Sequence, residues 1–490
     1  MTSFARYRSE WFGPNIHIPT ELISGILVAL ALIPEAISFS IIAGVDPKVG
    51  LYASFSIAVT LAFAGGRPGM ISAATASMAV LFIDLVKDHG LQYLLVTTIL
   101  IGILQIIAGL LRIDRMMGFI SRSVMTGFVN ALAILIFLAQ VPEMTGVPGL
   151  TYPLIAVGLA LIYLLPRVTK ILPSPLITIV LLTAVAMTFD FDVRTVGDMG
   201  ELPSSLPVFL LPDVPLNLET LRIILPVALA ATIVGLLESL LTASLIDEIT
   251  DTKSNKQRES IGQGLANFVT GLFGGMGGCA MIGQSMINTR AGGRGRLSTF
   301  TAGAFLLFLV VVLGDLVGRI PMAALVAVMI FVSVSTFRWS SLRELRTHPV
   351  SSSAVMVVTV AVVVATRNLA LGVLAGVIIS GLGFAWRLAQ STHVHRIETA
   401  DDHVQQYEVT GQVFFVSAEA FISRFDFDSR PERVSIDLGD AHLWDTSAVQ
   451  ALDRVIAKFE RNGATVEVTG LNEVSALLRS QVGGAGTTAH

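Results

Sequence analysis

The chain has 490 residues, of which 53% are hydrophobic and only 14% are charged, and its mean hydropathy is +0.74. Soluble domains carry about 25% charged residues, so this composition excludes a soluble enzyme with an ordinary polar surface. The net charge of −4 gives no indication of nucleic-acid binding. The single cysteine, Cys279, excludes disulfides within the chain and metal sites built on paired thiolates, and we expect neither a metal nor a cofactor.

The first part of the chain predicts a membrane domain preceded by a short polar segment. Residues 1–21 carry Arg6 and Arg8 and lack the pattern of a cleavable signal, so we expect a cytosolic segment. A helical span needs roughly 20 apolar residues, and twelve runs within the predicted transmembrane domain, 22–390, meet this requirement. They lie near 22–41, 48–64, 91–110, 119–139, 152–168, 173–190, 221–245, 257–273, 297–314, 321–337, 350–366 and 370–389.

Two shorter apolar stretches, 70–87 and 280–292, are rich in Gly, Ala and Ser and are weak as full spans. If both cross, there are fourteen segments, and four basic clusters fall on the side of the N-terminus. Basic residues in short loops mark the cytoplasmic side, so we expect a multi-pass protein of the plasma (inner) membrane with both termini in the cytoplasm. The clusters are Arg112, Arg115 and Arg122; Lys253, Lys256 and Arg258; Arg290, Arg294 and Arg296; and Arg338, Arg343 and Arg346.

Beyond Trp386 the sequence mixes charge and hydrophobicity as soluble domains do, and we assign 391–480 to a small cytosolic α/β domain. The alternating stretch 404–417 contains a glycine and predicts a strand hairpin. Helical spacing of apolar residues predicts a helix over 446–461. Further strands are expected at 433–438 and 464–470, a helix at 471–479 and a disordered tail at 481–490.

Four stretches resemble the sulfate permease (SulP) family, the anion transporters related to prestin, in its prokaryotic form. The longest is IPEAISFSIIAGVDPKVGLYAS at 33–54. The others are SRSVMTGFVNALAILI at 121–136 and NKQRESIGQGLANFVTGLFGG at 255–275, while IDLGDAHLWDTSAVQAL at 436–452 is similar to the STAS domain of anti-sigma-factor antagonists. Together these stretches extend the resemblance over nearly the whole chain.

The resemblance implies an α-helical membrane domain of two inverted seven-segment repeats, divided into a core and a gate, followed by STAS. In that fold the third and tenth segments are each a short strand and a half-helix, and the substrate binds between the two half-helix N-termini. The stretches 70–87 and 280–292 suggest this independently, since interrupted segments at matching places in two halves indicate a transport site. A half-helix N-terminus offers free N–H groups and a partial positive charge, which favour an anion.

The resemblance also places the site residues. In GRPGMISAATASM (66–78) we expect the half-helix to begin at Ala73, Ala74 and Thr75. In CAMIGQSMIN (279–288) Asn288 anchors the alignment with the family motif. Gly283 then occupies the position of a family serine, and Gln284 occupies the position where vertebrate members often carry arginine. The pocket then lacks a side-chain cation, and backbone dipoles with Thr75, Gln284 and Ser285 would hold the anion. The alternative is that these small residues only allow tight helix packing.

Glu35 stands within an apolar run where the family usually has glutamine. A charged group at mid-membrane costs about 2.5–3.5 kcal/mol on insertion scales, which indicates that Glu35 has a function. We hypothesise that it binds the substrate and couples proton entry to anion entry. The alternative is a permanently protonated Glu35 that replaces the hydrogen bonds of glutamine.

Glu238 lies inside the eighth segment, at a place comparable to that of Glu35 in the first repeat. The family has an acidic residue there, and nucleobase transporters of the same fold use one for substrate. We therefore expect Glu238 to bind substrate, and the alternative is a hydrogen bond that only fixes two helices. Phe39 is expected to form a wall of the pocket.

In the STAS stretch, Ser447 occupies the position at which anti-sigma-factor antagonists carry a phosphorylated serine. A capping role for Asp445 or Thr446 at the start of the helix is the simpler prediction.

Together these features predict a secondary active transporter of small anions, not an enzyme, that works by an elevator or rocking motion. We expect proton symport of a dicarboxylate such as fumarate or succinate, or of sulfate or bicarbonate. The rival functions are an anion channel or voltage-driven motor, an exchanger, a nucleobase symporter of the same fold, and a signalling module in which STAS is the active part. STAS domains of relatives bind partners and contribute to dimers, so the resemblance implies a homodimer and a possible cytosolic regulator.

Overall fold

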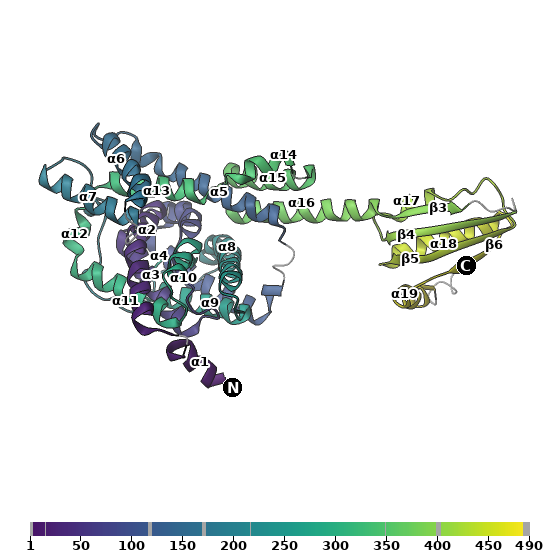
Figure 1. Ribbon diagram of the computed structural model, residues 1–490, viewed down its shortest axis with the longest axis horizontal. Helices are drawn as coiled ribbons and strands as arrows, with labels where there is room; N and C mark the ends of the chain where they lie inside the picture. Colours follow the sequence, from purple (N-terminus) through teal and green to yellow (C-terminus); the bar gives the residue numbers. More distant parts are fainter. Residues whose placement is uncertain are drawn as a thin grey trace. The chain divides into compact units, whose positions relative to one another are not determined.

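The computed structural model describes residues 3–14, 16–115, 120–168, 173–215, 217–347, 349–397 and 403–483. The chain divides into two compact units, Met1–Val377 and Ile378–His490, and the division falls inside helix α16 (Leu369–Gln390). Figure 1 shows the first unit as a bundle of helices and the second as a sheet with helices against it. Among the described residues, seven helices are long and apolar enough to cross a membrane, and four apolar helices are shorter.

The helical unit contains two runs of elements of the same kind. The first consists of α1 (Ser3–Phe12), α2 (Ile18–Ala43), α3 (Pro47–Ala64), β1 (Ser72–Ala74), α4 (Ala76–Leu110), α5 (Arg122–Gln140), α6 (Thr151–Leu164) and α7 (Ser174–Thr188). The second consists of α8 (Leu218–Thr250), α9 (Lys256–Leu272), β2 (Gly278–Ala280), α10 (Ile282–Arg290), α11 (Arg296–Val312), α12 (Gly314–Gly318), α13 (Met322–Thr336), α14 (Ser340–Thr347), α15 (Val350–Thr366) and α16. Short 3-10 turns occur at Pro142–Met144, Leu165–Arg167 and Val196–Met199.

Fourteen segments result, as the sequence predicts, because α4 contains two of them. Gly90 has φ 80° and ψ −174°, so the helical backbone is interrupted there, and a glycine tolerates this conformation without a Cβ clash. The first half of α4 follows β1, and α10 follows β2. Each pair is the strand and half-helix that the family resemblance implies. The first begins within the predicted stretch 70–87, whereas β2 begins two residues before the predicted stretch 280–292.

The helices form two groups. One group, the core, contains α2, α3, α4, α8, α9, α10 and α11, which pack on one another and surround the two short strands. The other, the gate, contains α5, α6, α7, α13 and α15. β1 and β2 pair antiparallel in the core, with Ser72 opposite Ala280 and Ala74 opposite Gly278. The two half-helices therefore begin at opposite ends of one small sheet.

Buried charged side chains fix several helix ends in the core. Glu21 accepts hydrogen bonds from the N–H groups of Arg294, Gly295 and Ser298 at 2.6–3.0 Å, at the start of α11. The Arg296 guanidinium is 1% exposed and donates to carbonyls at the end of α3 and to the Glu10 carboxylate at 2.7 Å. These bonds use groups that helix ends leave unsatisfied. If each segment crosses once, the end of α3, the starts of α5, α9 and α11 and the end of α13 lie on one side of the helical unit. We term this side the basic face and define it by Arg122, Arg258, Arg296 and Arg338.

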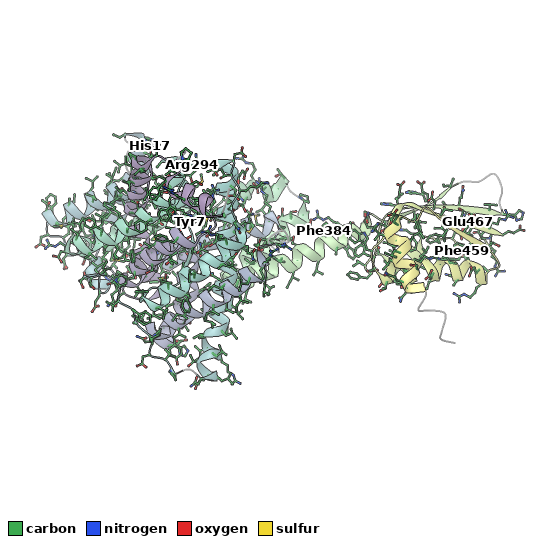
Figure 2. The ribbon with its side chains drawn as sticks, turned by 90° about the horizontal axis from the view of Figure 1, so that it is seen from below. Tyr7, His17, Arg294, Phe384, Phe459 and Glu467 are labelled. Carbon is green, nitrogen blue, oxygen red and sulfur yellow. The ribbon has the colours of Figure 1, made fainter. Side chains whose placement is uncertain are left out.

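The α1 helix packs on this basic face. Its Tyr7 ring lies 5.3 Å from the guanidinium carbon of Arg258 and 5.1 Å from that of Arg296. Tyr7 is labelled in Figure 2, where it lies against the helical unit. Cation–π contacts of this kind are worth about 0.5–2 kcal/mol. Together with the Glu10 ion pair they anchor the predicted N-terminal segment to the core.

The second unit is a four-stranded sheet in the order β3-β4-β5-β6, with β3 antiparallel to β4 and the other pairs parallel. Its elements are β3 (His393–Ile397), β4 (Val404–Val413), α17 (Ala418–Ser423), β5 (Arg433–Leu443), α18 (Thr446–Arg461), β6 (Thr465–Thr469) and α19 (Glu473–Gly483). The core of this unit is formed by the inner faces of the strands and by buried residues of α18, including Phe459, which Figure 2 labels.

Two predictions for this unit need correction. The hairpin expected within 404–417 is wrong, because 404–413 is one strand and its antiparallel partner is β3. Gly411 has φ 94°, but the pairing with β5 continues through it to Val413, so the glycine does not form a turn. In addition, 481–483 complete α19 and do not belong to a tail, while the remainder of the predicted tail, 484–490, lies outside the described residues.

Candidate functional site

A cavity of about 370 Å³ lies between the core and the gate. The core contributes α2, the start of α4, α8 and the β2–α10 junction, and the gate contributes α5, α7 and α13. The cavity extends from Glu35 to Met125 near the start of α5 and to Ser335 and Thr336 at the end of α13. Those helix ends adjoin Arg122 and Arg338, so the cavity reaches towards the basic face.

The two half-helices begin at this cavity. The residue before α4 is Thr75 and the residue before α10 is Met281, and neither makes a side-chain capping bond. Ala76 and Ser77 in the first turn of α4, and Ile282 and Gly283 in that of α10, line the cavity. First-turn N–H groups have no partner within their own helix and carry a partial positive charge. Two such sets therefore border one cavity.

Two carboxylates bind the first turns in a crossed arrangement. Glu35, on α2 of the first repeat, accepts a hydrogen bond from Gln284 Nε2 of α10 at 2.5 Å. Glu238, on α8 of the second repeat, accepts bonds from Ser77 Oγ of α4 at 2.6 Å and from Cys279 Sγ at 2.7 Å. Each repeat thus supplies a carboxylate to the half-helix of the other. Both carboxylates also line the cavity.

The predicted site residues divide into two sets. Six of them line the cavity, namely Glu35, Phe39, Thr75, Glu238, Gly283 and Gln284. Ala73 and Ala74 are buried in β1, paired with Cys279 and Gly278, because α4 starts later than the sequence suggests. Ser285 is fully buried, and its hydroxyl accepts a bond from the N–H of Ile71 at 3.0 Å. These three hold the strand pair and do not line the cavity.

Sequence reasoning missed Ser77 and Cys279. Thr75 Oγ1 lies 3.1 Å from Ser77 Oγ and 3.2 Å from Cys279 Sγ, so these three side chains and Glu238 form one cluster. Ser77 lies in the stretch 70–87, and Cys279 directly precedes the stretch 280–292. Glu238 is distant along the chain from both, and for Ser77 only the inverted pairing of the repeats could have indicated the contact.

The cavity wall contains no Lys, Arg or His among the residues that the structure describes. Its only ionisable carboxylates are Glu35 and Glu238, and the other lining side chains are apolar or neutral. Within the described ranges, no three His, Cys, Asp or Glu side chains lie close enough to hold a metal ion. An anion in this cavity would therefore be held by helix N-termini and neutral donors.

In the second unit, Asp445 caps α18. Its carboxylate accepts from the N–H of Ala448 at 2.9 Å and from that of Phe415 at 2.8 Å. The predicted capping role of Asp445 is confirmed. Ser447 lies in the first turn of α18 and is partly exposed. Its phosphorylation stays a prediction.

Comparison with known proteins agrees with this architecture. The sequence profile of the sulfate permease family matches residues 18–156 and 153–361, and that of the STAS domain matches 396–483. The "Putative sulfate transporter YbaR" of Bacillus subtilis is 57% identical over 475 residues, covering 97% of this chain and 98% of that protein. The bicarbonate transporter BicA of Picosynechococcus is 25% identical over 492 residues, covering 90% of this chain and 86% of that protein.

Solved structures show the same fold. The murine anion transporter Solute Carrier 26 family member A9, in its inward-facing state, superposes with a TM-score of 0.83 at 17% identity, covering 99% of this chain and 91% of that one. The transmembrane domain of cyanobacterial BicA gives a TM-score of 0.64 at 25% identity, and the match covers 74% of this chain and 98% of that one. Because the sulfate permease profile matches most of the chain and a relative that is 57% identical covers 97% of it, the chain belongs to the sulfate permease family.

Proposed function

We propose that the chain is a proton-coupled secondary transporter of a small anion, which binds in the cavity between the first turns of α4 and α10. The observation that supports this best is the pair of crossed contacts, Glu35 with Gln284 and Glu238 with Ser77. The family and its relatives are transporters rather than enzymes. Phe39, Thr75 and Gly283 complete the wall around the bound anion.

Proton coupling follows from the charges at the cavity. Two ionised carboxylates would repel an anion, and the described wall has no side-chain cation to offset them. Like charges disfavour each other strongly where the dielectric is low. Protonation of Glu35 therefore favours anion binding, and anion binding favours protonation. This reciprocal coupling is what a symporter requires.

The cargo is a small oxyanion: a dicarboxylate such as fumarate or succinate, sulfate, or bicarbonate. The named relatives are described for sulfate and for bicarbonate. Moving each negative charge inward costs about 2.3 kcal/mol per 100 mV, so an anion with two charges needs a coupled driving force more than an anion with one charge does. That argument favours the dicarboxylate and sulfate over bicarbonate.

The basic face defines the orientation. Because Lys and Arg in short loops stay in the cytoplasm, the basic face and both termini lie on the cytoplasmic side of the plasma membrane. In this orientation the cavity extends towards the cytoplasm. The STAS domain then lies in the cytosol, where we propose that it contributes to a homodimer and can bind a regulator.

Reconstitution tests the proposal. Purified protein in proteoliposomes is given a panel of labelled sulfate, succinate, fumarate and bicarbonate under an imposed pH gradient. We expect an acidic exterior to drive uptake of one of these anions. Uptake driven by a sodium gradient and indifferent to pH would contradict proton coupling, and chloride currents without substrate-dependent proton flux would favour a channel.

The Glu35→Gln variant identifies the proton carrier. Because glutamine cannot take up a proton, we expect this variant to lose pH-driven accumulation while still exchanging labelled for unlabelled anion. The matched control is Glu219→Gln, the same change at an exposed residue in the first turn of α8. Unchanged pH-driven uptake by Glu35→Gln would remove Glu35 from the coupling mechanism.

A further inference from the structure

A second cavity, of about 310 Å³, lies between core and gate on the side away from the basic face. Its wall includes Gln140, the last residue of α5, whose first residue is Arg122. Ser38 lines this outer cavity, and the next residue, Phe39, lines the transport cavity. The two cavities therefore adjoin neighbouring residues of α2.

Gln140 brings a polar side chain to the outer cavity. Its side chain is only 4% exposed, yet among the described residues it makes no side-chain hydrogen bond. Since buried polar groups are normally paired, this amide is free to hydrogen-bond whatever occupies the cavity, water or a ligand. An amide that lines a cavity in this state is suited to donate to a ligand there.

Arg367 brings a positive charge to the same wall. Its side chain is exposed and makes no ion pair with any described residue. The backbone holds it in place: Arg367 ends α15 with φ 52°, and the next residue, Asn368, caps α16 by accepting from the N–H groups of Ala370 and Leu371. A guanidinium presents several donors in a fixed planar fork that matches oxyanions.

The remaining polar groups of this wall are compatible with an anion. Glu143 is the one acidic residue of the described wall, and its carboxylate lies 3.4 Å from Arg194 Nη1, which balances its charge. The Ser38 hydroxyl donates to the carbonyl of Pro34 at 2.8 Å. The charge that is left over is that of Arg367.

We propose that the outer cavity is a second anion-binding site, in which Arg367 and the Gln140 amide hold a small oxyanion before it passes Phe39 to the transport site. That the bound anion is the cargo rests on the proposed function. The binding itself does not, because it depends only on the residues of this wall. An anion held here raises the local concentration of cargo at the outer entrance.

Protection from an arginine-specific reagent tests this site without requiring transport. Full-length protein in nanodiscs of zwitterionic lipid is treated with phenylglyoxal in sulfate, in succinate or in gluconate, and the modified peptides are quantified by mass spectrometry. We expect sulfate or succinate to slow modification of Arg367 about tenfold, as loss of access to one charge-assisted contact implies. Arg319, an exposed arginine between α12 and α13 that lines no cavity described here, is the internal control and should react alike in all three.

The variant Gln140→Leu removes the amide donor at similar size, and we expect the protection of Arg367 to weaken about tenfold. Glu35→Gln should keep full protection, so that failure of proton coupling and failure of this site are distinguishable. Equal modification of Arg367 in every anion would overturn the proposal. Protection that appears with anionic lipid in the nanodisc and no added sulfate or succinate would also overturn it, in favour of a lipid headgroup.

Discussion

At the scale of single residues, two glycines near the second half-helix have opposite surroundings. A Cβ on Gly278 would lie 2.1 Å from the carbonyl oxygen of Ala73, on the paired strand. A Cβ on Gly283 would meet no heavy atom within 4 Å. Gly278 is therefore required for the strands to approach, whereas Gly283 keeps space free in the cavity.

This difference predicts different outcomes for the same substitution. Gly283→Ala should fold with unchanged or slightly higher thermal stability, since alanine favours a helix by up to about 1 kcal/mol over glycine, but should bind the anion more weakly. Gly278→Ala should lose folded protein, because its clash is with backbone. Thermal unfolding and uptake at a series of anion concentrations measure both effects. Normal yield of Gly278→Ala would contradict the strand geometry.

The donors to Glu238 allow a second prediction. Cys279→Ala removes one of its two side-chain donors, and Cys279→Ser keeps a donor at that position. A hydrogen bond to a charged group contributes about 1.5–3 kcal/mol, so we expect Cys279→Ala to lower pH-driven uptake about tenfold and Cys279→Ser to lower it much less. Equal loss in both variants would indicate that the sulfur acts through packing and not as a donor.

The two carboxylates and Gln284 are predictable from the sequence, for two different reasons. Glu35 and Glu238 are charged residues in apolar runs, and Gln284 follows from the alignment on Asn288. Ala73, Ala74 and Ser285 were placed in the pocket because the start of a half-helix cannot be located to within one turn from small residues alone. Ser77 and Cys279 are not predictable from local sequence, because both contact Glu238 only after the chain folds.

At the scale of elements, helix ends in the core are stabilised by side chains from distant parts of the chain. Glu21 on α2 accepts from three N–H groups at the start of α11, and its side chain is 1% exposed. Glu259 on α9 accepts in the same way from the N–H groups of Gly66 and Arg67, before β1, at 2.7 and 3.0 Å. The basic face is thus held by carboxylates that accept backbone hydrogen bonds.

Glu21→Ala should therefore destabilise the core strongly. It leaves several buried N–H groups without an acceptor, and each such group costs about 1–3 kcal/mol. We expect a large fall in the melting temperature of the purified protein. Glu219→Ala, at an exposed first-turn position of α8, is the matched control and should change stability by less than about 1 kcal/mol. Similar melting temperatures for both variants would show that Glu21 does not cap α11.

Elements were predictable where composition changes sharply along the chain. Gly, Ala and Ser enrichment marked both half-helices, and apolar length marked the spans. The 404–417 hairpin failed because a glycine in an alternating run signals either a turn or a strand irregularity, and only pairing with a neighbouring strand decides. Here the register shift between Glu408 and Thr410 and the positive φ of Gly411 are absorbed within β4.

At the scale of the whole molecule, the STAS unit has a hydrophobic core of its own. The buried residues of that core all lie between Tyr407 and Ala464, and its partly buried neighbours lie between Val394 and Val482. We expect a fragment of residues 391–490 to fold alone with a cooperative thermal transition. Phe459→Ala should cost this fragment about 3–5 kcal/mol, measured by urea unfolding, with the exposed Phe415→Ala as control.

The division into a membrane unit and a soluble unit was predictable from composition, because the solvent of each is different. The crossed association of the two repeats was not, since it requires β1 and β2 to meet from opposite halves of the chain. The family resemblance supplied that topology where composition and periodicity could not.

The pairing of β1 with β2 has a consequence for the direction of flux. Since one small sheet joins the starts of both half-helices, we expect these two first turns to stay together on whichever side the cavity opens. The same first-turn N–H groups then face an anion that enters from either side, so the site can load in both directions. Accumulation or release is set only by the electrochemical gradients, and reversing the imposed pH gradient should turn an importer into an exporter.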